Sequence, residues 1–207
     1  MSRILIVRAH PLTSEASRSM QLADAFVRAY VRLHPDHDVS DLNLYSVAIP
    51  EIDLDLLSGW RKLSAGVPFV HLDQPEQNKV TLFSNYTDQF LAADKVVIAN
   101  PLWNLGVPTR LKAWVDTICV AGKTFRYNAA GDAVGLVTGK KALHIQASGG
   151  VFGGQDPASV YLKTMFNFLG VTDFVQVTAE GMDHDPTHAD EIMARAFARI
   201  EQAAKEF

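Results

Sequence analysis

The chain has 207 residues, of which 48% are hydrophobic and 20% charged, which suits a globular protein with a sizeable core. Its formal net charge of −4 excludes the basic surface typical of proteins that bind nucleic acid or anionic membranes. Cys119 is the only cysteine, which excludes an intrachain disulfide and a cysteine-based metal site.

A short apolar strand at residues 4–7 opens the chain, and an amphipathic helix is expected from about Arg18 to the His34-Pro35 pair. The loop between them holds His10 and Arg18 together with three serines, which are Ser14, Ser17 and Ser19. One serine there could simply cap the helix. Hydroxyls and a cation at a helix N-terminus also form a site for a phosphate monoester, so both interpretations stay open.

A second strand is expected at residues 38–44, followed by a helix at residues 53–63. We expect Leu54, Leu57 and Leu63 to form the inward face of that helix, because their spacing is helical. A longer helix near residues 76–93 then leads into the next strand.

The run of β-branched residues at 96–99 predicts a strand that is buried on both faces. We expect it to end at Asn100-Pro101, because proline cannot continue a central ladder. The next residues, Leu102-Trp103-Asn104-Leu105, are too apolar for a solvated loop. Since ligands of open α/β sheets bind beyond the carboxyl ends of the strands, this loop indicates a flat, partly polar ligand.

The remaining expected elements are a helix from 111 to Gly122, a hairpin at 124–138, strands at 142–146 and 174–178, and helices at 157–169 and from about 190 to the end. The helix at 157–169 begins with Asp156 as N-cap and is apolar on several faces, so it needs more than one apolar partner. Thr187 and Asp190 have the spacing of a capping box for the last helix.

Strands that alternate with helices predict a parallel sheet with helices on both faces. The count of five suits the flavodoxin-like order 2-1-3-4-5, whose ligand site lies between strands one and three. We expect residues 1–207 to form one such domain.

Two common phosphate-binding motifs are missing from the sequence, and their absence narrows the kind of ligand that the loops could bind. No G-x-G-x-x-G follows the first strand, and residues 135–141 have the wrong spacing for a P-loop. These absences disfavour a tightly held dinucleotide or nucleoside triphosphate. FMN has one phosphate and a flat ring, which suit the serine-rich loop, Trp103 and the Ser148-Gly149-Gly150 turn.

Several motifs stand in the order and spacing of a known family: residues 101–104, 121–127, 135–142, Gly149-Gly150 and Ala179-Glu180-Gly181. The chain resembles the FMN-dependent NADH-azoreductase family, which are flavodoxin-like NAD(P)H:quinone oxidoreductases. The resemblance extends from the first strand to the last helix. It implies a ping-pong reaction in which NADH or NADPH reduces bound FMN and a quinone or azo compound then takes two electrons.

The resemblance also implies the residues of the site. The FMN phosphate contacts fall on His10, Ser17, Arg18 and Ser19. The ring contacts fall on Pro101, Leu102, Trp103, Asn104, Leu105, Ala147, Ser148, Gly149 and Gly150. Relatives often carry a hydroxyl residue in place of His10 and an arginine in place of Ser148.

Pairing of two subunits is a further implication, with residues of one subunit lining the flavin pocket of the other. The candidates for this substrate-pocket wall are Phe125, Tyr127, Phe152 and Phe168, each of which could instead be a core aromatic. No catalytic side chain is expected, because the chemistry belongs to the flavin.

Other functions and sites compete with this interpretation. A flavodoxin-type electron carrier would be smaller and more acidic, and a scaffold protein without activity would bind no FMN. A metal site at His184 and His188 is disfavoured, because Pro186 breaks the helix that their spacing requires. Cys119 lies on an apolar helical face and is expected to fill the core. With no leader-like segment before the first strand and no apolar run of roughly 20 residues, we expect a cytoplasmic protein without a membrane span.

Overall fold

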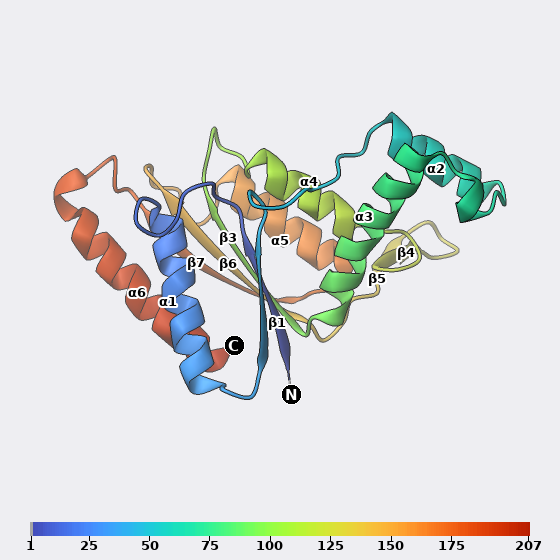
Figure 1. Cartoon of the computed structure of the whole chain (residues 1–207). Helices are drawn as coiled ribbons and strands as arrows, with labels where there is room; N and C mark the ends of the chain where they lie inside the picture. Colours follow the sequence, from blue (N-terminus) through green and yellow to red (C-terminus); the bar gives the residue numbers. More distant parts are fainter. Residues whose placement is uncertain (1) are drawn as a thin grey trace.

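The structure is a computed structural model that describes residues 2–207. Five parallel strands form its central sheet in the order β2-β1-β3-β6-β7 (Figure 1). Their bounds are β1 Arg3–Arg8, β2 Asp38–Asn43, β3 Lys95–Pro101, β6 Lys141–Ser148 and β7 Asp173–Glu180. This is the expected 2-1-3-4-5 order, and the flavodoxin-like fold class is confirmed.

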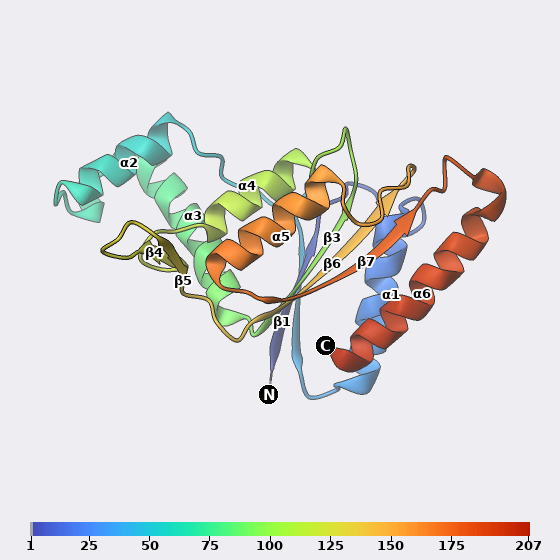
Figure 2. The same cartoon turned by 180° about the vertical axis from the view of Figure 1, so that it is seen from behind.

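Helices cover both faces of the sheet (Figures 1 and 2). On one face lie α1 (Arg18–Leu33) and α6 (Ala189–Glu206), and on the other lie α3 (Gln74–Ala92), α4 (Thr109–Ile118) and α5 (Pro157–Leu169). Successive residues of a strand point to opposite faces, so Val97 and Ala99 enter the core under α1 and α6 while Val96 and Ile98 enter the core under the other three helices.

Four shorter elements extend from these layers: α2 (Leu54–Ser64), the 3₁₀ turns η1 (Phe69–His71) and η2 (Pro186–His188), and a hairpin of β4 (Phe125–Tyr127) and β5 (Ala133–Gly135). The expected hairpin is confirmed. The expected inward face of α2 is wrong for Leu54 and Leu57, which are 80% and 52% exposed, whereas Leu63 packs inward against the cluster of Leu56, Val80 and Phe83. α2 packs against α3 through Leu56 and Gly59, and its other side faces solvent.

β3 ends at Pro101, as the sequence predicts, and its pairing with β6 includes the proline itself. Pro101 pairs with Ala147 of β6, and Leu102 N donates to Ala147 O at 3.0 Å. Ala99 O accepts from Ala9 N, which is the last such bond toward β1. The backbone of Pro101 faces the β1 side of β3, two residues beyond Ala99, where β1 has already ended. The N–H that proline lacks would therefore have no acceptor on β1.

Two expected helix ends also differ. α4 stops at Ile118, and Gly122 instead takes a positive φ of 83° in the following turn. The capping box at Thr187 is wrong: α6 begins after His188 without a side-chain cap, because Thr187 Oγ1 donates to Asp185. Along residues 2–207, none of the helices combines the length and apolar character needed to cross a membrane.

Candidate functional site

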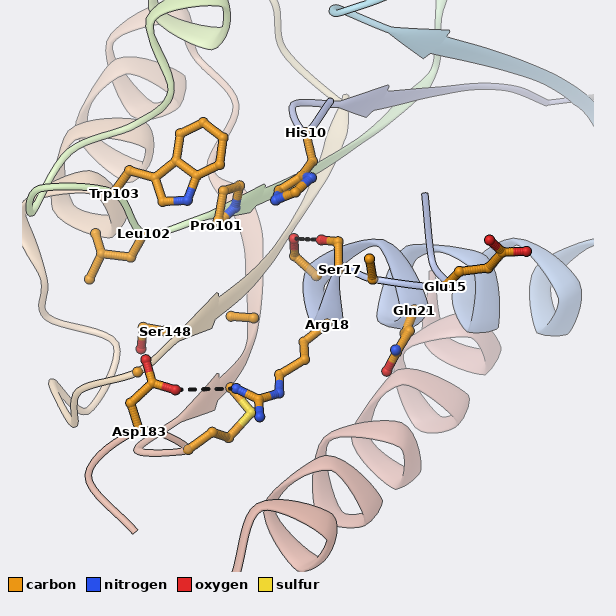
Figure 3. Close-up of a pocket in the computed structure, with 15 residues that line it drawn as sticks. His10, Glu15, Ser17, Arg18, Gln21, Pro101, Leu102, Trp103, Ser148 and Asp183 are labelled. Carbon is orange, nitrogen blue, oxygen red and sulfur yellow. Dashed lines mark hydrogen bonds and ion pairs between the residues drawn. The ribbon is translucent and has the colours of Figure 1, made fainter. Parts of the chain in front are cut away.

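A cavity of about 460 Å³ lies at the carboxyl edge of the sheet, between the N-terminus of α1 and the ends of β3 and β6 (Figure 3). This is the edge where ligands bind in open α/β sheets. The residues that line the cavity are His10, Glu15, Ala16, Ser17, Arg18, Ser19, Gln21, Pro101, Leu102, Trp103, Ala147, Ser148, Gly149, Met182 and Asp183.

The first wall is the N-terminus of α1. Ser17 is its N-cap: the side-chain oxygen accepts from Met20 N and lies 3.2 Å from the Ser19 hydroxyl. Both serines are buried, and Arg18 lies between them in sequence. The first amides of a helix have no intrahelical acceptor and carry partial positive charge, so this wall suits a phosphate.

His10 stands between that wall and Trp103. Its Nδ1 accepts from Leu12 N at 2.9 Å, which leaves the ring proton on Nε2 as a donor. Burial lowers the pKa of His10, so a neutral imidazole is favoured over a second cation. The two ring centroids are 5.2 Å apart with the planes tilted by 57°, and Figure 3 shows both rings at one end of the cavity.

The second wall is the apolar loop after β3. Trp103 and Gly106 exchange backbone hydrogen bonds at 3.2 and 2.9 Å, which closes a tight turn around Asn104 and Leu105. Both turn residues have positive φ, 49° and 60°, as the type I′ turn requires. A leucine in this region is strained, since such turns favour glycine at that position. The turn presents the Trp103 ring, 40% exposed, beside the cavity.

The third wall is formed by the loops after β6 and β7. A Cβ on Gly149 would lie 2.1 Å from Asp183 Oδ2, so only glycine allows the two loops to meet. Asp183 in turn pairs with Arg18 at 3.4 Å, the ion pair drawn in Figure 3. Both side chains are well exposed, so the pair is a weak one.

The cavity brings together the expected cofactor residues except Asn104, Leu105 and Gly150. Leu105 instead lines a separate apolar groove of about 420 Å³ with Val107, Pro157 and Tyr161. Gly150 lies under the ring of Phe152, where a Cβ would come within 2.9 Å of it.

The expected substrate-pocket residues lie elsewhere. Phe125 contacts Phe168 and Tyr127, with ring centroids 4.6 and 5.8 Å away, at the hairpin and the end of α5. Neither these three nor Phe152 lines the cavity, so one chain alone does not place them over it.

Sequence reasoning missed Glu15, Ala16, Gln21, Met182 and Asp183. A signal existed for Met182 and Asp183, because they follow the last strand and therefore lie at the same carboxyl edge as the other loops. From the sequence, the tract from Met182 is interpreted as a solvated loop with a helix cap rather than as part of the cavity. Within residues 2–207, no group of three or more His, Cys, Asp and Glu side chains could hold a metal ion.

Cys119 is held away from reactivity. It packs against the core under α3, α4 and α5, and burial raises the pKa of its thiol to about 12. The thiolate is the reactive form, so this cysteine is unreactive at neutral pH.

Comparisons with known proteins agree with this geometry over the whole chain. Residues 2–204 match the family model described as "Flavodoxin-like fold". A Streptococcus suis protein named FMN-dependent NADH:quinone oxidoreductase is 42% identical, and a Geobacillus kaustophilus protein of the same name is 43% identical, each over 100% of both chains. A Bacillus anthracis FMN-dependent NADH-azoreductase, solved in complex with FMN, superposes with a TM-score of 0.91 at 36% identity, covering 100% of this chain and 99% of that one.

The chain belongs to the family of FMN-dependent NADH:quinone oxidoreductases and azoreductases. The resemblance read from the motifs is therefore confirmed. The cavity fits the cofactor of this azoreductase family: the α1 N-terminus offers amides and hydroxyls for one phosphate, and Leu102 and Trp103 offer a flat apolar wall for a ring.

Proposed function

We propose that this protein is an FMN-dependent NADH:quinone oxidoreductase that also reduces azo compounds. The observation that carries the proposal is the cavity itself, because it joins a phosphate-binding helix terminus to a flat apolar wall in a single space. Relatives with this activity in their names match the chain from end to end.

Each wall has its own part in holding FMN. Ser17, Ser19 and Arg18 would bind the phosphate, with His10 donating from Nε2. Trp103 and Leu102 would contact the ring. The glycine at 149 lets the loops after β6 and β7 meet, and its backbone would lie beside the polar edge of the ring.

FMN held in this cavity would supply the redox chemistry, which is hydride acceptance from NADH and two-electron reduction of a quinone or azo compound. The chain's own residues bind and orient. Backbone N–H groups at the ring's polar edge would stabilise negative charge as it develops there. No side chain of the cavity is needed as a nucleophile.

We also propose a homodimer with its flavin sites at the subunit interface. Support comes from apolar side chains that one chain leaves exposed around α5 and the neighbouring loops: Leu105, Tyr127, Val151 and Val160. Exposed apolar side chains that gather on one side of a molecule mark an interaction site. The second chain would bring the predicted substrate-pocket residues to the cavity that its partner leaves open, namely Phe125, Tyr127, Phe152 and Phe168.

The extent and location of the protein are further parts of the proposal. The family match over residues 2–204 supports one flavin-binding domain across residues 1–207. A lone cysteine, Cys119, is consistent with a reducing compartment, so we propose a cytoplasmic location.

The test is a visible absorption spectrum of the purified protein with added FMN, followed by anaerobic titration with NADH. We expect FMN to bind and its absorbance to bleach with NADH alone. Binding without bleaching would favour a flavodoxin-type electron carrier. A protein that takes up no FMN would favour a scaffold and would overturn the proposal.

The same titration tests the phosphate wall. Arg18→Gln should weaken FMN binding about tenfold, because a charge-assisted contact is lost. The matched control is Arg32→Gln, which removes an exposed arginine that pairs with Glu201 far from the cavity. Equal FMN affinities for the two variants would show that Arg18 does not bind the phosphate.

A further inference from the structure

Behind the cavity, on the α5 side of the sheet, lies a cluster of polar side chains that the proposed reaction does not use. Its members are Asn100, His144, Gln146, Asp156, Ser159 and Gln176. All but Gln176 are no more than 2% exposed. The neighbouring positions of β3 and β6 on this face of the sheet carry Val96, Ile98 and Ala142. Apolar side chains would therefore also fit where the cluster lies. Polar groups are costly to bury unless each is paired.

The hydrogen bonds of the cluster run in one direction. Asn100 Nδ2 donates to Gln146 Oε1 at 3.1 Å, and Gln146 Nε2 donates to Asp156 Oδ2 at 2.8 Å. Asn100 Oδ1 is therefore the acceptor for His144 Nε2, 2.9 Å away. The orientation of the Asn100 amide is thus fixed from both sides.

This orientation matters because of a second bond from the same nitrogen. Asn100 Nδ2 also donates to the carbonyl oxygen of Pro101 at 2.9 Å. That carbonyl faces the side of β3 where β1 has already ended. The N–H of the same peptide group, on Leu102, donates to Ala147 O at 3.0 Å.

The peptide group between Pro101 and Leu102 is therefore held at both ends, by a side chain and by β6. Pro101 and Leu102 line the cavity, and Trp103 follows directly (Figure 3). The strained turn at Asn104 and Leu105 begins one residue later. A strained loop keeps its shape only when the surrounding structure over-determines it.

We propose that Asn100 is a positioning residue for the cofactor: through the carbonyl of Pro101 it fixes the peptide group from which the Leu102–Trp103 wall is built. This inference rests on the proposed function, because the wall is argued to hold FMN. In this inference, the buried polar cluster keeps the Leu102–Trp103 wall in the position that the cofactor requires.

The experiment compares Asn100→Ala and Asn100→Asp with Ser159→Ala. Asn100→Asp retains an acceptor for His144 but loses the donor to Pro101. Ser159→Ala breaks the cluster at its other end, where Gln176 Nε2 donates to Ser159 Oγ at 2.6 Å, and leaves the Asn100–Pro101 bond intact. For each variant, the melting temperature without FMN, the FMN dissociation constant and the visible circular dichroism of bound FMN are measured.

We expect all three variants to melt at lower temperature than the wild type. Only the two Asn100 variants should weaken FMN binding, by about tenfold, and change the circular dichroism of the flavin. Wild-type affinity and spectrum in Asn100→Asp would overturn the inference, as would an equal loss of affinity in Ser159→Ala. If Asn100→Ala does not fold, Asn100→Asp alone decides. Failure of the wild-type protein to bind FMN would instead overturn the proposed function.

Discussion

His144 shows how burial of a single residue couples stability to pH. The ring is fully buried between Asn100 and Gln176, and desolvation lowers its pKa from 6.5 to about 4. The folded state therefore keeps His144 neutral at pH values where the unfolded chain already binds a proton. Its contribution to stability is complete above about pH 6.5 and is lost progressively as the pH falls toward 4.

The wild-type protein should therefore lose about 2 kcal/mol of unfolding free energy between pH 7 and pH 5 through His144 alone. His144→Leu removes that share, so its stability should fall less over the same interval. Urea unfolding at both pH values measures the difference. His71→Leu, which removes an exposed histidine, is the control and should keep the wild-type dependence. Parallel curves for wild type and His144→Leu would contradict the prediction.

At the scale of single residues, the sequence predicts which residues follow the ends of the strands. It does not predict which side chains from different elements form hydrogen bonds with one another. Ser17, Trp103 and Gly149 could be predicted because each follows a strand whose carboxyl end meets the others. The polar cluster could not be predicted, although His144 and Gln146 alternate visibly with Leu143 and Ile145. Their partners come from other elements, and only the register of β6 against β3 and β7 brings them together.

Among the elements, the loop between β6 and α5 depends on one carboxylate from β7. Glu180 accepts the backbone N–H groups of Phe152, Gly153 and Gly154 at 2.7, 2.7 and 2.8 Å. Gly153 and Gly154 have φ of 61° and 71°, which lets three successive amides converge on one side chain. Glu180 therefore organises the segment that carries Phe152 toward α5.

Glu180→Gln should loosen this loop, because an amide has one acceptor oxygen where the carboxylate has two and it carries no charge. We expect hydrogen exchange at Phe152, Gly153 and Gly154 to accelerate about tenfold or more, while the strands stay protected. Glu201→Gln is the matched control, since Glu201 on α6 forms an exposed ion pair with Arg32 on α1. Unchanged exchange in Glu180→Gln would show that the glycine turns hold the loop by themselves.

Helices whose partners are local were the hardest to predict. The spacing of Leu54 and Leu57 is helical, but α2 packs mainly against α3 and buries Leu56 and Gly59 instead. A pattern of apolar residues identifies a helix and does not say which side finds a partner. By contrast Asp156, followed by a proline, caps α5 as expected, with Ser159 N donating to its side chain at 3.0 Å.

At the scale of the whole molecule, strand order was predictable because alternating strands and helices leave few topologies, and right-handed crossovers restrict them further. The path of each loop beyond the sheet was not. Surface that one chain leaves uncovered points to the next level of assembly. α5 illustrates this, with Leu162 and Phe166 in the core and Val160 46% exposed.

Val160 therefore provides the test of the proposed homodimer. Val160→Glu places a charge on the outer face of α5, and burying it in a subunit interface would be costly. Sedimentation of the wild type should give twice the 22.7 kDa of one chain, and the variant should dissociate at protein concentrations about a hundredfold higher.

Val31→Glu is a close control, because Val31 is 45% exposed on α1, the helix across the sheet, and its substitution should leave the dimer intact. If the flavin site is completed by the partner, Val160→Glu should also weaken FMN binding at concentrations where it is monomeric, whereas Val31→Glu should not. A wild-type protein that sediments as a monomer would contradict the homodimer outright. A dimer with normal FMN affinity in Val160→Glu would place the interface on another face of the molecule.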